Sequence, residues 1–171
     1  DNAQAIGAAW CGKTNRHGQS GTFGLMGTTS FFPSKNLGCM GDGGAIVTSD
    51  DAVATRCKQI ANHGMVKQYH HDVVGINSRL DGLQAAILRV KLKHLRGYLS
   101  ARQAAAARYD ALLEGCAGLR IPIREHRSSH VFHQYTLKIE GGRRDALRTH
   151  LAEHGIPSGV YYPVPGHAQQ A

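Results

Sequence analysis

Apolar side chains recur at helical spacing between residues 80 and 99, where they form two adjacent stripes. The first stripe comprises Leu80, Leu83, Ile87 and Val90, and the second comprises Leu88, Leu92, Leu95 and Leu99. Two neighbouring stripes predict a helix with a wide buried face, because residues three and four apart lie on one side of an α-helix. The helical pattern starts near Asp81 and continues to Leu113, with Gly97 as a candidate break.

Shorter patterns upstream predict two strands and a capped helix. Residues 28–32 form a β-branched and aromatic run that ends at a proline, and residues 44–48 follow a glycine-rich turn. Asp50 and Asp51 can accept hydrogen bonds from the free amides of a first helical turn, and they predict a helix of about twelve residues. The short alanine-rich segment at residues 3–10 predicts one or two helical turns. The glycine-rich and polar residues 12–24 and the polar residues 63–77 predict two loops.

The pattern changes after residue 114. Residues 131–140 predict a strand, residues 143–154 predict a helix, and a short strand is expected near Val160. Strands that alternate with helices are typical of layered α/β folds. We therefore predict an α/β architecture with a first part at residues 1–114, which includes the long helix, and a smaller α+β part at residues 115–171.

The composition is that of an ordinary globular protein. The chain is 42% hydrophobic and 19% charged, which excludes disordered and collagen-like classes. No apolar run approaches the roughly 18 residues that a membrane helix needs, so we expect no membrane partner. The four cysteines lie far apart in the sequence and form no C-x-x-C pair. Reduced thiols and a cytoplasmic location are therefore expected.

The net charge of +8 indicates a partner that carries phosphate groups. Nucleic acids and small phosphorylated ligands both fit this charge. The basic residues are scattered, and the densest group is Arg89, Lys91, Lys93 and Arg96. This group is typical of a solvated helix face, so we expect a phosphorylated small molecule and no nucleic-acid partner.

Glycine is the compositional outlier, and nearly half of the 21 glycines lie among the first 44 residues. Such crowding marks tight turns or a close approach of the backbone to a ligand. Lys35 lies inside this region, after a strand end and a proline and before Gly38. A lysine held on a tight loop can act as a nucleophile that forms a Schiff base, and the alternative interpretation is a solvated surface charge.

Five segments, in the order in which they occur, favour a Schiff-base role for Lys35 over that of a surface charge. They are Asp1–Gly7, Ser30–Gly44, Gly75–Asp81, Gln84–Ala86 and Tyr161–His167. In this order they resemble the DegT/DnrJ/StrS family of pyridoxal-phosphate-dependent sugar aminotransferases, and the resemblance covers essentially the whole chain. It implies fold type I of the pyridoxal-phosphate-dependent transferases, with a large cofactor-binding domain to residue 114 and a small C-terminal domain after it.

The resemblance also implies a cofactor, pyridoxal 5′-phosphate, and a role for five residues. Lys35 matches the lysine that forms the Schiff base with the cofactor and moves a proton between the substrate carbon and the cofactor. Asp1 matches the carboxylate that pairs with the pyridine nitrogen, and Gln4 matches the residue beside the phenolic oxygen. Ser30 matches the hydroxyl that binds the cofactor phosphate. Asn77 matches the amide that reaches the same phosphate from a neighbouring subunit, so the resemblance implies a homodimer with shared active sites.

The substrate region is expected at Arg79, Tyr161, Tyr162 and His167, which match positions that family members use around a sugar nucleotide. Their alternative interpretations are an ion pair for the arginine and edge packing for the tyrosines. The motifs resemble those of enzymes that aminate a UDP-linked 3-keto sugar, of the 2-acetamido-3-oxo uronate type, with glutamate as amino donor, for surface polysaccharide synthesis. The chain begins at the first motif and lacks the family's later elements, so we expect a part of a longer enzyme.

Two other functions compete with this interpretation. His150, Glu153 and His154 match the H-x-x-E-H pattern of a zinc peptidase, because histidines four apart on a helix can bind one metal. No further carboxylate ligand is evident and Gly155 ends the helix at once, so we expect no metal site. A regulatory member of the family, or an inactive fragment that binds a partner, is the second alternative. It would not need Lys35 as a nucleophile.

Overall fold

The computed structural model describes residues 1–12 and 17–170. The chain forms two compact units. Unit 1 comprises Asp1–Leu112 and Ile123–Tyr135, and unit 2 comprises Leu113–Pro122 and Thr136–Ala171. Residues 123–135 thus lie in unit 1, although they follow the position at which the sequence predicted the second part to begin.

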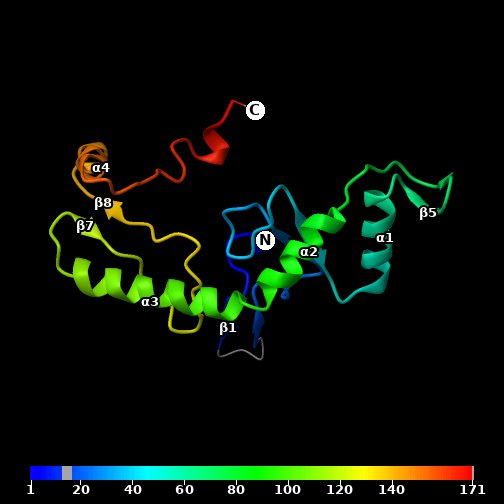
Figure 1. The fold of residues 1–171 in the computed structure, drawn as a ribbon, viewed down its shortest axis with the longest axis horizontal. Helices are drawn as coiled ribbons and strands as arrows, with labels where there is room; N and C mark the ends of the chain where they lie inside the picture. Colours follow the sequence, from blue (N-terminus) through cyan, green and yellow to red (C-terminus); the bar gives the residue numbers. More distant parts are fainter. Residues whose placement is uncertain (13–16, 171) are drawn as a thin grey trace. The chain divides into compact units, whose positions relative to one another are not determined.

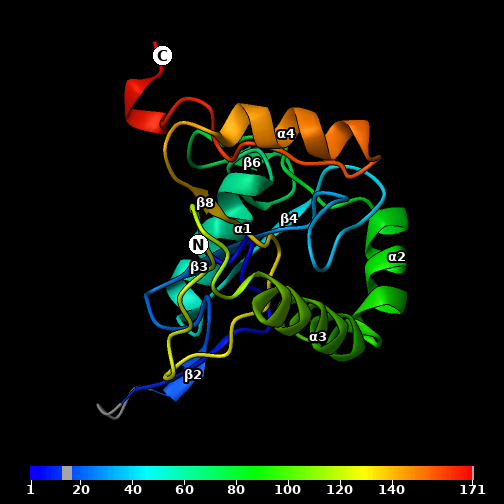
Figure 2. The same cartoon turned by 90° about the vertical axis from the view of Figure 1, so that its left-hand side faces the viewer.

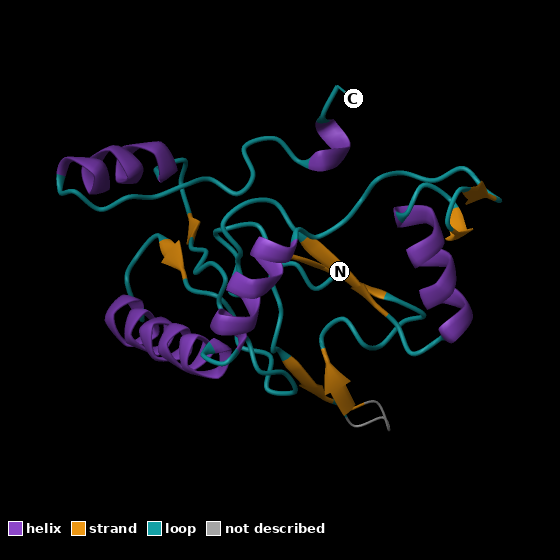
Figure 3. Ribbon diagram, turned by 45° about the vertical axis from the view of Figure 1, so that its right-hand side comes forward, coloured by secondary structure: helices purple, strands orange, loops and turns teal. Residues whose placement is uncertain are grey.

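The described residues of unit 1 form three antiparallel two-stranded sheets and three helices (Figures 1 and 3). The paired strands are β1 (Ala9–Cys11) with β2 (His17–Gln19), β3 (Gly27–Ser30) with β4 (Gly44–Val47), and β5 (Met65–Lys67) with β6 (His70–His71). The helices are α1 (Asp51–Ala61), α2 (Gly82–Leu92) and α3 (Leu95–Leu113), the last of which ends in unit 2. Unit 2 adds β7 (Leu119–Arg120) with β8 (Lys138–Ile139), α4 (Arg144–Glu153) and η1 (Gly166–Ala168).

Helix α1 begins where the aspartates predicted it. The Asp50 carboxylate accepts a hydrogen bond from the Val53 amide at 2.9 Å, which satisfies a donor that has no partner within the helix. The long helical region is divided, as expected, but the break lies at residues 93–94. Gly97 is inside α3. Helices α2 and α3 follow one another with a clear change of direction (Figures 1 and 2).

Several predicted elements differ from the structure. The predicted loop at 63–77 contains the β5–β6 hairpin, and the predicted helical turns near the N-terminus are turns followed by β1. The loop predicted at 12–24 contains β2, and its residues 13–16 lie outside the described part of the chain. Only Lys138–Ile139 of the predicted strand at 131–140 is a strand. No strand occurs near Val160 among the residues that the structure describes.

The buried centre of unit 1 joins the loop after β3 to α2. Leu37, Cys39 and Leu88 form its core, and Phe31 and Leu95 pack against it. The described elements pack against only part of the apolar surface of α2. Leu83 remains 71% exposed and Val90 61% exposed, so the predicted wide buried face is covered on one side only.

None of the helices in the described residues is long and apolar enough to cross a membrane.

Candidate functional site

Lys35 lies on a tight loop that folds back onto the end of β3. The Lys35 amide donates a hydrogen bond to the Phe32 carbonyl oxygen at 2.9 Å, and the Cys39 amide donates one to the Phe31 carbonyl oxygen at 2.8 Å. A Cβ atom at Gly38 would lie 2.4 Å from the Pro33 carbonyl oxygen, so only glycine fits where the two ends of the loop meet. The backbone that carries Lys35 is therefore held from both sides.

The Lys35 side chain is half-buried. Among the residues that the structure describes, its ε-amino group forms no hydrogen bond and no ion pair. The two residues that follow, Asn36 and Leu37, are each 5% exposed. The buried residues Asn36 and Leu37 thus fix the loop in the core, and the amine of Lys35 is available to react.

The N-terminal segment runs beside the same strand. The Asn2 amide donates a hydrogen bond to the Thr28 carbonyl oxygen at 2.6 Å, and the Thr29 hydroxyl donates one to the Asn2 carbonyl oxygen at 3.4 Å. Asp1 is exposed, and its carboxylate accepts a hydrogen bond from the Ala3 amide at 2.9 Å. Gln4 is exposed on the turn that follows.

Ser30 is the last residue of β3, and its hydroxyl oxygen accepts a hydrogen bond from the Phe32 amide at 3.2 Å. The strand therefore has Asp1 alongside it and Ser30 at its end, and the Lys35 turn follows at once. Three of the predicted cofactor residues lie along one strand and the loop that it leads into.

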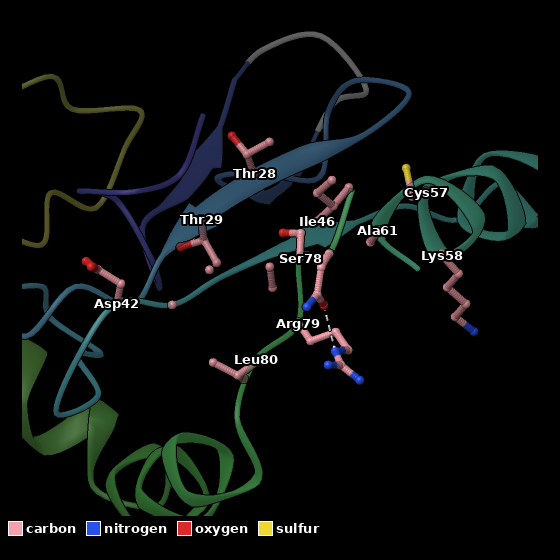
Figure 4. A pocket seen from close by; sticks show the side chains of 14 residues that line it. Thr28, Thr29, Asp42, Ile46, Cys57, Lys58, Ala61, Ser78, Arg79 and Leu80 are labelled. Atoms are coloured by element: carbon pink, nitrogen blue, oxygen red, sulfur yellow. Dashed lines mark hydrogen bonds between the residues drawn. The ribbon is translucent and has the colours of Figure 1, made fainter. Parts of the chain in front are cut away.

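Asn77 and Arg79 lie in a different place, in a groove beside the β3–β4 hairpin (Figure 4). The Arg79 Nε donates a hydrogen bond to the Asn77 Oδ1 at 2.9 Å, and this bond is drawn in the figure. Cys57 and Lys58 of α1 line another side of the same groove. Neither Lys35 nor Ser30 lines it, so within one chain the structure groups Asn77 with Arg79 and apart from Lys35.

The remaining predicted substrate residues belong to unit 2. Tyr161 and Tyr162 are exposed, with their rings edge to face and the ring centroids 5.5 Å apart. His167 is exposed on the short helix η1. The rival zinc pattern lies on α4, where the His154 Nδ1 is 2.8 Å from the His150 carbonyl oxygen. No group of three metal-binding side chains occurs in the described part of the chain.

His133 is a residue near Lys35 that the sequence analysis did not single out. The pKa of His133 is lowered by burial and, in second place, by the positive charges of Lys35 and Arg102. Asn36 ties this region to the Lys35 loop, because its Nδ2 donates a hydrogen bond to the Val131 carbonyl oxygen at 3.3 Å. The sequence pattern around His133 predicted a strand, and its spacing gave no sign of a role near a lysine 98 positions away.

The segment that carries His133 is also fixed at α3 by a polar cluster. The Asp110 carboxylate accepts hydrogen bonds from the Tyr135 hydroxyl at 2.7 Å and from the Arg124 guanidinium. These bonds hold the pKa of Asp110 below its usual value, and the bond from Arg124 has the larger effect. Burial and the bond to Asp110 raise the pKa of Tyr135 to about 12. The two ends of residues 124–135 are thus joined to one residue of α3.

Comparison with known proteins supplies the family. The model of the DegT/DnrJ/EryC1/StrS aminotransferase family matches residues 1–171. A protein of Acidithiobacillus ferrooxidans named UDP-N-acetyl-3-dehydro-alpha-D-glucosamine 3-aminotransferase is 47% identical over 170 residues, which are 99% of this chain and 44% of that protein. A "pleiotropic regulatory protein" of Geobacillus stearothermophilus is 47% identical over 171 residues, which are 99% of this chain and 44% of that protein.

Solved structures give the same family. The DesV protein of Streptomyces venezuelae, solved in complex with a ketimine intermediate, has a TM-score of 0.91 and 42% identity, over 99% of this chain and 44% of that one. A Bacillus subtilis protein with bound cofactor PMP has a TM-score of 0.77 and 32% identity, over 87% of this chain and 35% of that one. The chain therefore spans less than half the length of the relatives it matches.

These neighbours confirm the α/β class and the type I fold of pyridoxal-phosphate-dependent transferases. The match along the full chain and the likeness to solved members lead to one conclusion. The chain belongs to the DegT/DnrJ/EryC1/StrS aminotransferase family.

Proposed function

We propose that the full-length protein transfers an amino group from glutamate to a nucleotide-linked keto sugar, with pyridoxal phosphate as cofactor, for the synthesis of a surface polysaccharide. The observation that carries the proposal is the Lys35 loop. A half-buried lysine whose amine has no partner among the described residues lies on a rigid turn, in a chain that matches an aminotransferase family from end to end.

The residues along β3 fit this cofactor. When bound, pyridoxal phosphate supplies an aldehyde and a pyridine ring that withdraws electrons. Lys35 offers an amine for the aldehyde, and Ser30 offers a hydroxyl for the phosphate. The carboxylate of Asp1, which is held beside β3 through its neighbour Asn2, suits the ring nitrogen. The three groups thus match the aldehyde, the phosphate and the ring nitrogen of the cofactor in charge and hydrogen-bonding capacity.

Each residue then has a defined task. Lys35 takes a proton from the donor carbon and later returns one to the sugar carbon, which is the work of a general base and general acid. Asp1 keeps the ring nitrogen protonated, because a nearby negative charge raises the pKa of a cation. Gln4 donates a hydrogen bond to the phenolic oxygen through its amide.

We propose that the active site is shared between two copies of the chain. Asn77 lies in the groove beside α1, apart from Lys35, and it is exposed there. An exposed amide in that place is available to a second copy, where it would donate a hydrogen bond to the phosphate held by Ser30. Large side chains such as Leu83 and Val90 are exposed on α2, which is compatible with further covering surfaces in the full-length homodimer.

The proposed substrate is a UDP-linked 3-keto sugar. The support comes from the Acidithiobacillus ferrooxidans relative, whose name specifies a UDP-linked 3-dehydro sugar. Arg79 suits phosphate or carboxylate oxygens, since a guanidinium donates two parallel hydrogen bonds to such groups. Tyr161, Tyr162 and His167 are proposed to surround the sugar. The net charge of +8 favours the approach of a diphosphate.

Reductive trapping tests the proposal. The full-length protein is incubated with pyridoxal phosphate, reduced with borohydride and digested, and the modified lysine is located by mass spectrometry. We expect the label on Lys35 and its loss in Lys35→Ala, whereas the matched variant Lys138→Ala, in β8 of unit 2, keeps it. A label that is spread over several surface lysines, or unchanged in Lys35→Ala, would contradict the proposal.

A regulatory role is the second candidate, because the Geobacillus stearothermophilus relative carries a regulatory name at equal identity. A purely regulatory protein would bind a partner and would show no amino transfer to any keto sugar nucleotide. A full-length protein that labels at Lys35 but transfers no amino group across a panel of such sugars would favour this candidate.

A further inference from the structure

Helix α2 meets the loop that carries Lys35, residues 31–43, with polar as well as apolar side chains. Gln84, Leu88 and Lys91 lie four and three residues apart, so their side chains project from one side of the helix. Leu88 packs in the core against two residues of the loop. Gln84 and Lys91 are half-buried and precede and follow Leu88 along the helix. This side of α2 therefore presents a polar group at each end of its apolar contact.

Both polar side chains bond to the backbone of the loop. The Met40 amide donates a hydrogen bond to the Gln84 Oε1 at 2.8 Å, and the Lys91 side-chain amine donates one to the Gly38 carbonyl oxygen. Residues 38 and 40 belong to no helix or strand, so side chains of α2 satisfy groups that a neighbouring strand would otherwise pair. The Met40 side chain is 79% exposed, so its backbone rather than its packing holds this residue in place.

The residues between and beside these two bonds are also held closely. Cys39 is 2% exposed, its amide bonds to Phe31 as described above, and its Sγ lies 3.0 Å from the carbonyl oxygens of Phe31 and Gly41. A Cβ atom added at Gly41 would lie 3.0 Å from the Gln84 Nε2. Each residue from 38 to 41 is thus tied to α2 or to the end of β3.

This segment in turn touches the group that fixes the Lys35 backbone. The Phe32 carbonyl oxygen accepts the hydrogen bond from the Lys35 amide at 2.9 Å. The same oxygen would lie 2.7 Å from a Cβ atom at Gly38, so the backbone of Gly38 packs directly against it. The bond from Lys91 at Gly38 and the bond from Gln84 two residues later therefore act on the position of Lys35 through one short chain of contacts.

We propose that Gln84 and Lys91 are positioning residues for Lys35, because they hold residues 38–41 against α2 and so fix the backbone from which the reactive amine extends. The inference rests on the proposed function only in the choice of Lys35 as the reactive amine. Gln84 belongs to one of the five segments that carry the family resemblance, and the proposed cofactor and substrate residues leave it without a task.

Hydrogen exchange of the full-length protein, resolved to single amides, tests the attachment without any cofactor. Gln84→Met keeps the length of the side chain and removes the oxygen, so the Met40 amide loses its acceptor. We expect exchange at Met40 to become about tenfold faster, the scale of one hydrogen bond. Exchange at the Lys35 amide should rise with it. Unchanged exchange at Lys35 would overturn the proposal, whether or not Met40 responds.

Gln103→Met is the matched control. Gln103 is a half-buried glutamine on α3, and its Nε2 donates a hydrogen bond to the His130 carbonyl oxygen at 2.9 Å, outside residues 31–43. Both methionine variants lose one bond between a side chain and the backbone, so urea denaturation should show similar losses of stability. Only Gln84→Met should speed exchange at Lys35. Gln84→Glu should restore slow exchange, because a carboxylate oxygen accepts the same bond. Equal exchange at Lys35 in the two methionine variants would overturn the proposal.

The labelling rate of Lys35 shows whether the attachment matters to its amine. The full-length variants react at one pH with pyridoxal phosphate or with formaldehyde, and a borohydride reagent traps each product. Formaldehyde reaches an amine in many orientations, whereas a bound cofactor needs the amine in one place. We expect Gln84→Met and Lys91→Met to slow labelling by pyridoxal phosphate about tenfold and to leave labelling by formaldehyde unchanged. Lys93→Met, at an exposed lysine of the same region, should keep both rates.

The two reagents separate this inference from the proposed function. Equal slowing with both reagents, or no slowing with either, would contradict a positioning role for Gln84 and Lys91. A wild-type protein that formaldehyde labels at Lys35 and pyridoxal phosphate does not would refute the proposed function, and the exchange at the Lys35 amide would then decide this inference alone.

Discussion

Gly38 closes the loop that carries Lys35, and its replacement by alanine is the sharpest structural perturbation of the site. The new Cβ would lie 2.4 Å from the Pro33 carbonyl oxygen and 2.7 Å from that of Phe32, both in backbone that cannot turn aside. An ordinary contact begins at 3.4 Å. The two ends of the loop must therefore separate by about 1 Å, a displacement that can lower an enzymatic rate about 100-fold.

The stability effect follows from the same contacts. An extra methyl group in a tightly packed place costs about 1–3 kcal/mol, so we expect Gly38→Ala to lower the free energy of unfolding by this amount. Urea denaturation of the full-length protein measures it, and the rate of borohydride-trapped labelling at Lys35 reports on the position of the amine. We expect both quantities to fall together.

Gly97→Ala is the matched control. Gly97 is inside α3, and an added Cβ would meet no atom within 4 Å. The substitution removes backbone freedom from the unfolded chain, so it should raise the free energy of unfolding by about 0.5–1 kcal/mol and leave labelling unchanged. If Gly38→Ala and Gly97→Ala behave alike, the geometry of the Lys35 loop described above is wrong.

Two single contacts give further predictions. Asn36→Ala removes the buried donor to the Val131 carbonyl oxygen, so urea denaturation should show a loss of about 1–3 kcal/mol, and an unchanged midpoint would contradict this. Hydrogen bonds from the Arg127 side chain and amide lower the pKa of Glu125 from 4.5 to about 2. A carboxylate whose pKa is lower in the folded than in the unfolded protein stabilises the fold at pH values above its pKa in the unfolded state. This stabilisation is lost as the pH falls to its pKa in the folded state. Between pH 4.5 and pH 2 the melting temperature should therefore fall more steeply for the wild type than for Glu125→Gln, and parallel curves would refute the assignment.

Local chemistry made part of the fold predictable. The Asp50 cap of α1 and the strands β3 and β4 depend on residues that lie close together in the sequence, and they occur where the pattern indicates. The segment after residue 130 depends on distant residues. Asn36 and Arg102 occupy the carbonyl oxygens of residues 131–133, so a β-branched and aromatic run that predicts a strand forms none there.

The candidate site also contains some residues that the sequence predicts and others that depend on distant contacts. Lys35 and Ser30 are recognisable because their motif is continuous and lies on one strand and its loop. His133 could not be found from its neighbours, since its link to Lys35 depends on the fold and on the hydrogen bond from Asn36. The exposed positions of Asn77 and Arg79 also depend on long-range packing, which joins residue 77 to residue 62 by a β-bridge.

Transfer of labelled nitrogen is the direct test of the proposed amino transfer and of the role of Lys35 in it. The full-length protein with pyridoxal phosphate is given ¹⁵N-glutamate and a UDP-linked 3-keto sugar, and mass spectrometry follows the nitrogen. We expect ¹⁵N in the sugar nucleotide with the wild type and none with Lys35→Ala. A wild-type protein that leaves all of the label in glutamate would contradict the proposed amino transfer, and a Lys35→Ala variant that transfers the label at the wild-type rate would contradict the role of Lys35.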